Sequence, residues 1–158
     1  MTDYVEFVRV DGTVKVQVAA ATNLVAGEWI VYSTGAAKNT TNGAINVLGV
    51  ALHNANNTSG ALGDLEVTVV TSGLIKAPAV VETAATDAFD ATIAIGDRLS
   101  LGGDAGGNVA DGQGLVDGIN ASGSDQDTFA EGLVVAIALG AVGAATYDSD
   151  LEALLTIN

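Results

Sequence analysis

Few residues in this chain have the chemistry of a catalytic group, and the first of them is its single histidine. His53 directly follows an apolar run, in His-Asn-Ala-Asn-Asn, and the chain has no cysteine. A Ser-His or Cys-His nucleophile pair would therefore have to be built on His53 alone. No Gly-x-Ser-x-Gly motif accompanies it. A small hydrolase using His53 is one hypothesis, and a histidine at the rim of a loop is the simpler interpretation.

A glycine-rich stretch, Gly102 to Asn108, has the composition of a phosphate-binding or Ca²⁺-binding turn. A P-loop requires Gly-Lys-Ser/Thr, yet no lysine follows Lys76. The Ca²⁺-binding β-roll requires several tandem repeats, and only one copy is present. We therefore interpret the stretch as a hairpin loop.

Acidic residues offer a third kind of chemistry, because carboxylate oxygens are the ligands that Ca²⁺ and Mg²⁺ prefer. Asp125, Asp127 and Glu131 lie close together, and Asp104 lies in the glycine-rich stretch. An EF-hand loop requires Gly at its sixth position and Glu at its twelfth, which this segment lacks. We predict no metal site and no cofactor. An acidic divalent-cation-binding cell-surface or S-layer-type β module is kept as the alternative function.

Net charge limits the partners of the chain. Five Lys and Arg stand against nineteen Asp and Glu, which gives a formal net charge of −14 and a pI near 4.1. Such a chain is repelled by phosphate backbones, so we expect no direct binding to nucleic acid. The acidity fits either solubility or a high-salt, halophilic habitat in which self-repulsion is screened, and both interpretations stay open.

No segment has the pattern of a membrane anchor or an export signal. The longest apolar run, Gly132 to Ala145, is about 14 residues long and too short to cross a bilayer of roughly 30 Å as a helix. The first residues, Met1 to Glu6, have neither a basic nor an apolar region of a signal peptide. We expect no membrane partner and synthesis in the cytoplasm.

Composition favours an all-β fold. Hydrophobic residues make up 49% of the 158 residues, but aromatics only 4%, and 20 glycines stand against one proline. Small, β-branched and glycine-punctuated sequence is typical of short strands joined by tight turns. We predict one domain over residues 1–158, a compact β-barrel or β-sandwich with long loops. The expected loops are 33–43, 54–63, 102–114 and 118–127, and we expect some of them to touch a partner.

The segment Leu65 to Pro78 is the clearest strand signal. Leu65, Val67 and Val69 alternate with polar residues, as expected when one face of a strand is buried. Thr71-Ser72-Gly73 then has the chemistry of a turn, and Pro78 limits the apolar run that follows. The segment predicts a strand, a bend and a second strand.

Near the N-terminus the sequence predicts a β-hairpin. Tyr4 to Val10 and Thr13 to Ala19 flank Asp11-Gly12, a dipeptide favoured in two-residue hairpin turns. Residues 1–19 are therefore expected to form a hairpin or arm, and for Met1 to Tyr4 a mobile arm is kept as the alternative.

Three motifs recur in the same order, which predicts an internal duplication. Ala26-Gly27-Glu28-Trp29-Ile30 matches Ile95-Gly96-Asp97-Arg98-Leu99, the run 46–52 matches 131–139, and 63–69 matches 149–155. The predicted halves are residues 20–80 and 93–158, joined by a connector, residues 81–92, of more helical composition. Ser149 to Glu152 would fit a helix capping box, but the match to Leu65 favours a strand there.

The same motif order resembles the small capsid decoration, or cement, proteins of tailed bacteriophages and related viruses, a family described as DUF2190-like. The motifs that carry the resemblance are Ala26 to Val31, Leu48 to Leu52, Gly73 to Pro78, Ile95 to Leu99 and Gly132 to Ala138. Longer insertions at 81–92 and 118–127, and the acidity, depart from the family pattern.

The resemblance implies a structural virion protein and not an enzyme. It implies a β-barrel that binds the outer surface of an HK97-type capsid, with the major capsid protein as partner, as a homotrimer at local three-fold positions. Aromatic residues are scarce and lie early in the chain, so we expect subunit or capsid contacts through Tyr4, Phe7, Trp29 and Tyr32.

Overall fold

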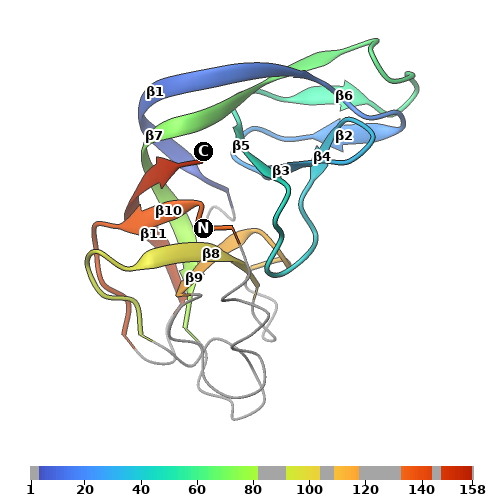
Figure 1. The fold of residues 1–158 in the computed structure, drawn as a ribbon. Coiled ribbons are helices and arrows are strands. Elements are labelled where there is room, and N and C mark those ends of the chain that lie inside the picture. Colours follow the sequence, from blue (N-terminus) through green and yellow to red (C-terminus); the bar gives the residue numbers. More distant parts are fainter. Residues whose placement is uncertain (1–3, 82–91, 104–108, 118–132, 144–146, 158) are drawn as a thin grey trace.

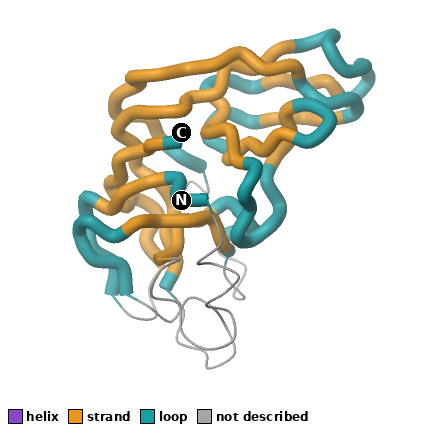
Figure 2. Tube along the Cα trace, viewed as in Figure 1, coloured by secondary structure: helices purple, strands orange, loops and turns teal. Residues whose placement is uncertain are grey.

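The structure, a computed structural model, describes residues 4–81, 92–103, 109–117, 133–143 and 147–157 (Figure 1). Every regular element in this part of the chain is a strand, and none is a helix (Figure 2). The predicted all-β class is therefore confirmed. The strands are β1 (Glu6–Gln17), β2 (Thr22–Leu24), β3 (Trp29–Tyr32), β4 (Ala36–Lys38), β5 (Val47–Ala51), β6 (Ala55–Asn57), β7 (Glu66–Val80), β8 (Arg98–Gly102), β9 (Gly114–Asp117), β10 (Ala136–Ala138) and β11 (Tyr147–Thr156).

Five strands close a barrel in the second half of the chain. β7 pairs with β11, β11 with β10, β10 with β8, β8 with β9, and β9 returns to β7 through a parallel pairing at Ala79 and Leu115. We call this ring the C-terminal barrel. Its interior is filled by residues that alternate along the strands, among them Ile75, Leu99 and Leu155, all buried.

The first half of the chain forms a second ring, which we call the N-terminal lobe. β1, β7, β5, β3 and β4 are neighbours in that order, and a parallel bridge between Val18 and Ala36 closes the ring. β2 pairs with β6 in a separate ribbon. Ile30 and Val67 point into this lobe, whereas Trp29 points into the core cluster that also fills the C-terminal barrel. The two rings are therefore packed against each other through apolar side chains.

β7 belongs to both rings (Figure 1). Val69 and Val70 pair with β5, and from Ser72 onward the same edge of β7 pairs with β11. The bend expected at residues 71–73 does not interrupt the strand, because backbone pairing continues through it on both sides. Residues 71–73 instead mark the point at which the partner of this edge of β7 changes from β5 to β11.

The only proline sits inside β7, where it cannot donate a ladder hydrogen bond. Opposite Pro78, two residues of β11 (149 and 150) face one residue of β7, since Asp148 pairs with Ala79 and Leu151 with Ala77. This β-bulge lets the ladder pass a residue that has no N–H.

The predicted N-terminal hairpin is wrong. β1 is one continuous strand that runs antiparallel to β7 from Glu6 to Gln17. Asp11 and Gly12 sit at irregularities in the register and not in a turn. The long ladder with β7 satisfies far more backbone groups than a local hairpin, so tertiary pairing outweighs the turn propensity of Asp-Gly.

Two of the expected loops contain strands. Residues 33–43 include β4 and residues 54–63 include β6, each of three residues. Their polar and glycine-rich composition masked strands this short. The C-terminal segment is a strand, β11, as predicted. Residues 82–91 of the connector and the segments 104–108 and 118–132 lie outside the described residues.

The three repeated motifs occupy two meanders of the same topology. β5 lies antiparallel between β3 and β7, and β10 lies antiparallel between β8 and β11. Ala51 pairs with Val69, and Ala138 pairs with Ala153. By this pairing Val69 corresponds to Ala153, whereas the sequence match aligns Val69 with Leu155. The two matches of the third motif differ by two residues, a shift that keeps each side chain on the same face of the strand. A duplication in the history of the chain stays a prediction.

Candidate functional site

The imidazole of His53 forms hydrogen bonds with two backbone groups. Its Nε2 accepts a hydrogen bond from Thr68 N at 3.1 Å, and its Nδ1 lies 3.0 Å from Asn54 O. Because Nε2 accepts, the proton is on Nδ1 and is donated to Asn54 O. Neither ring nitrogen is left to take a proton from a nucleophile. His53 therefore links the loop between β5 and β6 to β7.

Acidic side chains do not gather in the described part of the chain. Among those residues, no group of three or more His, Asp and Glu side chains is close enough to hold a metal ion. Asp104, Asp125, Asp127 and Glu131, on which the divalent-cation alternative depends, lie outside the described residues. The same part of the chain contains no helix long and apolar enough to span a bilayer.

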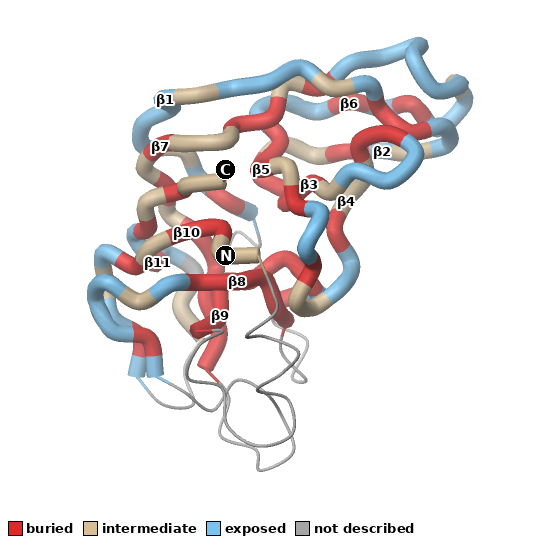
Figure 3. The backbone as a smooth tube through the Cα atoms, viewed as in Figure 1, coloured by how far each residue is buried: buried red, intermediate tan, exposed pale blue. Residues whose placement is uncertain are grey.

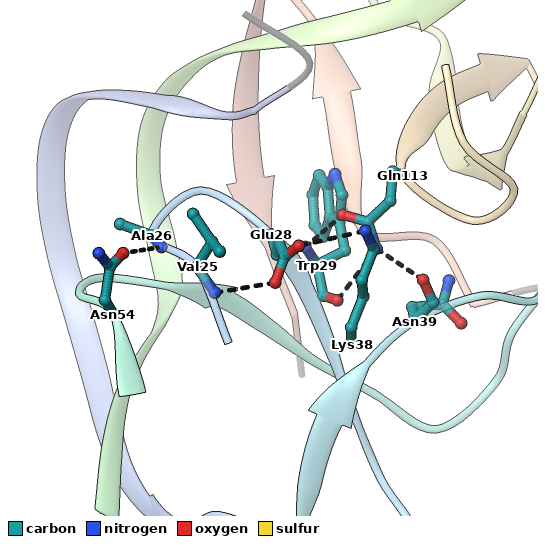
Figure 4. A network of polar contacts seen from close by, with 8 residues as sticks. All are labelled: Val25, Ala26, Glu28, Trp29, Lys38, Asn39, Asn54 and Gln113. Carbon is teal, nitrogen blue, oxygen red and sulfur yellow. Dashed lines mark hydrogen bonds and ion pairs between the residues drawn. The ribbon is translucent and has the colours of Figure 1, made fainter. Parts of the chain in front are cut away.

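A buried polar network joins the N-terminal lobe to the loop before β9 (Figure 4). The Glu28 carboxylate, 4% exposed, accepts a hydrogen bond from Val25 N at 2.9 Å and pairs with Lys38 Nζ at 3.1 Å. The side-chain amide of Asn54 accepts a bond from Ala26 N at 2.8 Å. These contacts fix the turn that leads into β3.

The Gln113 side chain adds hydrogen bonds between the two rings, which also share β7. Its Oε1 accepts a hydrogen bond from Trp29 N at 2.9 Å, and its Nε2 donates to Asn39 O at 2.7 Å (Figure 4). The Asn39 amide in turn donates to Gly112 O at 2.9 Å. Since Gln113 and Asn39 are both buried and satisfied by backbone groups, their side chains orient the two rings and are not free to bind a substrate, whereas the buried Trp29 Nε1 has no hydrogen-bond partner in the described part of the chain.

The four aromatic residues expected at contacts have different environments. Tyr4 and Tyr32 are 40% and 46% exposed, and Phe7 is half-buried against the core. Trp29 has no exposed surface, so a contact through its side chain does not fit the structure. Its alternation on β3 places it between the two rings, where it serves as a core residue.

One sheet face concentrates the positive charge of the chain. Directly paired residues share a face, and the pairs Arg9–Leu74, Leu74–Leu154, Leu154–Ile137 and Ile137–Arg98 make one row across β1, β7, β11, β10 and β8. We call the surface around this row the outer face. By the alternation of β7, Lys76 lies on the same face as Leu74, two residues before it.

The outer face combines half-buried aliphatic side chains with three of the five basic residues, Arg9, Lys76 and Arg98. Lys76 is paired across the strands with Glu6 and Glu152, and Arg9 forms an ion pair with Asp11, at 2.9 Å. Charges on this face are therefore balanced, while the chain as a whole carries −14. Contact through the outer face meets less repulsion than contact through the remaining, acidic surface.

A hollow of about 260 Å³ lies on the outer face, lined by Arg98, Val134, Ile137 and Thr156. Its volume falls below the roughly 300–1,000 Å³ of small-molecule sites. The Arg98 guanidinium makes no ion pair or hydrogen bond with the described part of the chain. The hollow suits a side chain of a partner better than a metabolite.

Sequence reasoning did not identify the outer face, although a signal was present. Leu74, Ile137 and Leu154 are apolar residues at positions that strand alternation assigns to the solvent side, between buried neighbours such as Ile75 and Leu155. Single apolar residues at solvent positions are common, but a contiguous apolar surface rimmed by polar residues is typical of an interaction site.

No protein-family model matches this chain, and no curated protein matches its sequence. The resemblance to capsid decoration proteins therefore rests on the order of the motifs, which lie on β3, β5, β7, β8 and β10 and the turns beside them.

Proposed function

We propose that this protein is a capsid decoration protein that attaches to the outer surface of an HK97-type viral capsid and stabilises it. In this proposal the partner is the major capsid protein, the location is the virion surface, and the assembled form is a homotrimer. The location, the partner and the trimer come from the resemblance. The protein is not an enzyme in this proposal.

The observation that supports the proposal is the outer face. It spans five strands of a rigid sheet and combines an aliphatic row with balanced charge in a chain of net charge −14. A protein that covers a shell in many copies needs a stiff body and a contact face of modest strength, because many weak contacts add up. The buried network around Gln113 supplies stiffness between the two rings.

Co-sedimentation with shells tests the proposal. Purified protein is incubated with expanded shells of the major capsid protein encoded in the same genome, over a range of salt concentrations. We expect saturable binding to the shells and an increase in their resistance to heat. Absence of saturable binding at every salt concentration would overturn the proposal.

Matched variants locate the contact. Ile137→Asp places a charge in the aliphatic row, and Ile45→Asp places the same charge at a side chain that is 71% exposed elsewhere. We expect Ile137→Asp to weaken shell binding at least tenfold and Ile45→Asp to leave it unchanged, with both variants folded by circular dichroism. Equal effects of the two variants would show that the outer face is not the contact.

A further inference from the structure

Each of the two meanders begins with a tight corner, and the first is formed by Val25–Glu28, the N-terminal corner. The Glu28 carboxylate accepts a hydrogen bond from Val25 N at 2.9 Å. Gly27, with φ of 89°, donates its N–H to Ala51 O at 2.8 Å, and Ala51 N donates to Glu28 O at 2.9 Å. The corner thus ties the start of β3 to the end of β5.

The second corner, Ala94–Asp97, has the same hydrogen bonds. The Asp97 carboxylate accepts from Ala94 N at 2.7 Å. Gly96, with φ of 93°, donates to Ala138 O at 2.8 Å, and Ala138 N donates to Asp97 O at 2.9 Å. We call it the C-terminal corner. The two corners are equivalent residue for residue.

The N-terminal corner is occupied by the chain itself. Val5 N donates a hydrogen bond to Gly27 O at 2.9 Å, and Val5 is only 5% exposed. A Cβ added at Gly27 would lie 2.6 Å from Val5 O and 2.8 Å from Tyr4 Cβ. The N-terminal corner is therefore a binding site for an extended segment in which an aromatic residue is followed by a β-branched one.

Among the described residues, the C-terminal corner has no such occupant. Apart from Gly96 itself and its two neighbours in the chain, none of these residues has an atom within 4 Å of the Cβ position of Gly96, and none donates a hydrogen bond to its carbonyl oxygen. Ile95, which precedes Gly96, is 71% exposed, and Leu139, which follows the Ala138 that Gly96 binds, is 42% exposed. Ala94 and Ala141 are exposed as well, so four exposed apolar residues lie near this corner, where the charged group is the half-buried Asp97 carboxylate that Ala94 N binds.

We propose that the C-terminal corner binds an extended apolar segment of another protein, in the way that the N-terminal corner binds Tyr4 and Val5. The segment donates a backbone N–H to Gly96 O, and its aliphatic or aromatic side chains cover Ile95 and Leu139. Its chemistry follows from the occupied copy: an extended backbone, a β-branched side chain at the donating residue, and no charge in contact with the corner. The proposal does not depend on the capsid role.

The test uses the full-length protein and a capped peptide with the sequence of residues 3–8, Asp-Tyr-Val-Glu-Phe-Val, as the probe. Isotope-labelled protein is titrated with the peptide up to millimolar concentration, and backbone and methyl resonances are followed by NMR. We expect saturable shifts at the Gly96 amide and at the Ile95 and Leu139 methyl groups.

Two serine variants make the result specific. Ile95→Ser removes the most exposed apolar side chain of the corner, and Ile45→Ser removes a side chain of the same type and the same 71% exposure elsewhere. We expect at least a fivefold weaker peptide affinity in Ile95→Ser and unchanged affinity in Ile45→Ser.

Three results would overturn the proposal. One is the absence of shifts at the C-terminal corner at the highest peptide concentration. A second is that shifts occur only at Gly27, which would mean that the peptide merely replaces residues 4 and 5. A third is that Ile95 and Leu139 shift with protein concentration in the absence of peptide, which would assign the corner to a second copy of this chain. If the wild-type protein binds the peptide but does not bind shells, the result would count against the capsid role alone.

Discussion

Substituting Gln113 by alanine removes the hydrogen bonds that its side chain makes between the two rings, without touching the outer face. The substitution leaves two buried backbone groups without their present partners, the Trp29 N–H and the Asn39 carbonyl. The Trp29 carbonyl also loses a longer bond of 3.3 Å, but it keeps the bond that Asn39 N donates to it at 2.8 Å.

The expected cost follows from these two groups. A buried polar group that loses its partner costs about 1–3 kcal/mol, so the two together cost about 2–6 kcal/mol. Water that enters the space vacated by the side chain recovers part of this, which leaves about 2–4 kcal/mol. Such a change is a large fraction of the stability of a domain of this size.

Urea unfolding followed by the fluorescence of Trp29, the single tryptophan, measures the change in the free energy of unfolding. Gln17→Ala, at an exposed position of β1, is the control and is expected to fall within about 0.5 kcal/mol of the wild type. A Gln113→Ala protein that unfolds within about 0.5 kcal/mol of the wild type would refute the contribution assigned to these hydrogen bonds.

Three smaller changes follow from local geometry. Gly49→Ala places a methyl group against the backbone of β7 and is expected to cost about 3 kcal/mol or more, whereas Gly96→Ala, also at positive φ but in open space, costs only about 1 kcal/mol; equal losses in thermal melts would contradict the steric account. His53→Ala removes two hydrogen bonds at an exposed site and should cost about 1 kcal/mol in urea unfolding, with no loss expected if the side chain is free. The hydrogen bond from Arg9, with its charge, lowers the pKa of Asp11 below the ordinary value. Its small contribution to stability is present above the ordinary pKa and lost as the pH falls through the lowered one. NMR titration of the carboxyl should show this lowered pKa in the wild type and a higher pKa in Arg9→Gln; an unchanged pKa in the variant would contradict the pairing.

The strands that alternate cleanly could be predicted from the sequence. Val67 and Val69 lie on the buried face of β7, and the repeat of Gly27-Glu28 at Gly96-Asp97 marks two equivalent corners, since turn chemistry of this kind is local. The Asp11-Gly12 hairpin failed for the opposite reason, because the partner of β1 is a strand that begins at Glu66, far along the chain. The local propensity of residues 4–19 gives no information about that partner strand.

Contact surfaces were harder to predict than strands. The aromatic residues were expected at contacts because they are scarce, and scarcity says nothing about the direction of a side chain. Trp29 lies on the strand face that points between the rings, while Tyr32, three residues on, is exposed at the end of β3. The outer face comes from residues of four strands beside β7, and its row exists only through their register.

Cryo-electron microscopy of shells incubated with the protein tests the central proposal most directly. We predict additional density on the outer surface of the shell, into which the two rings fit with Leu74, Ile137 and Leu154 toward the shell. Shells without added density at saturating protein, or with the protein attached through a surface remote from this row, would contradict the account.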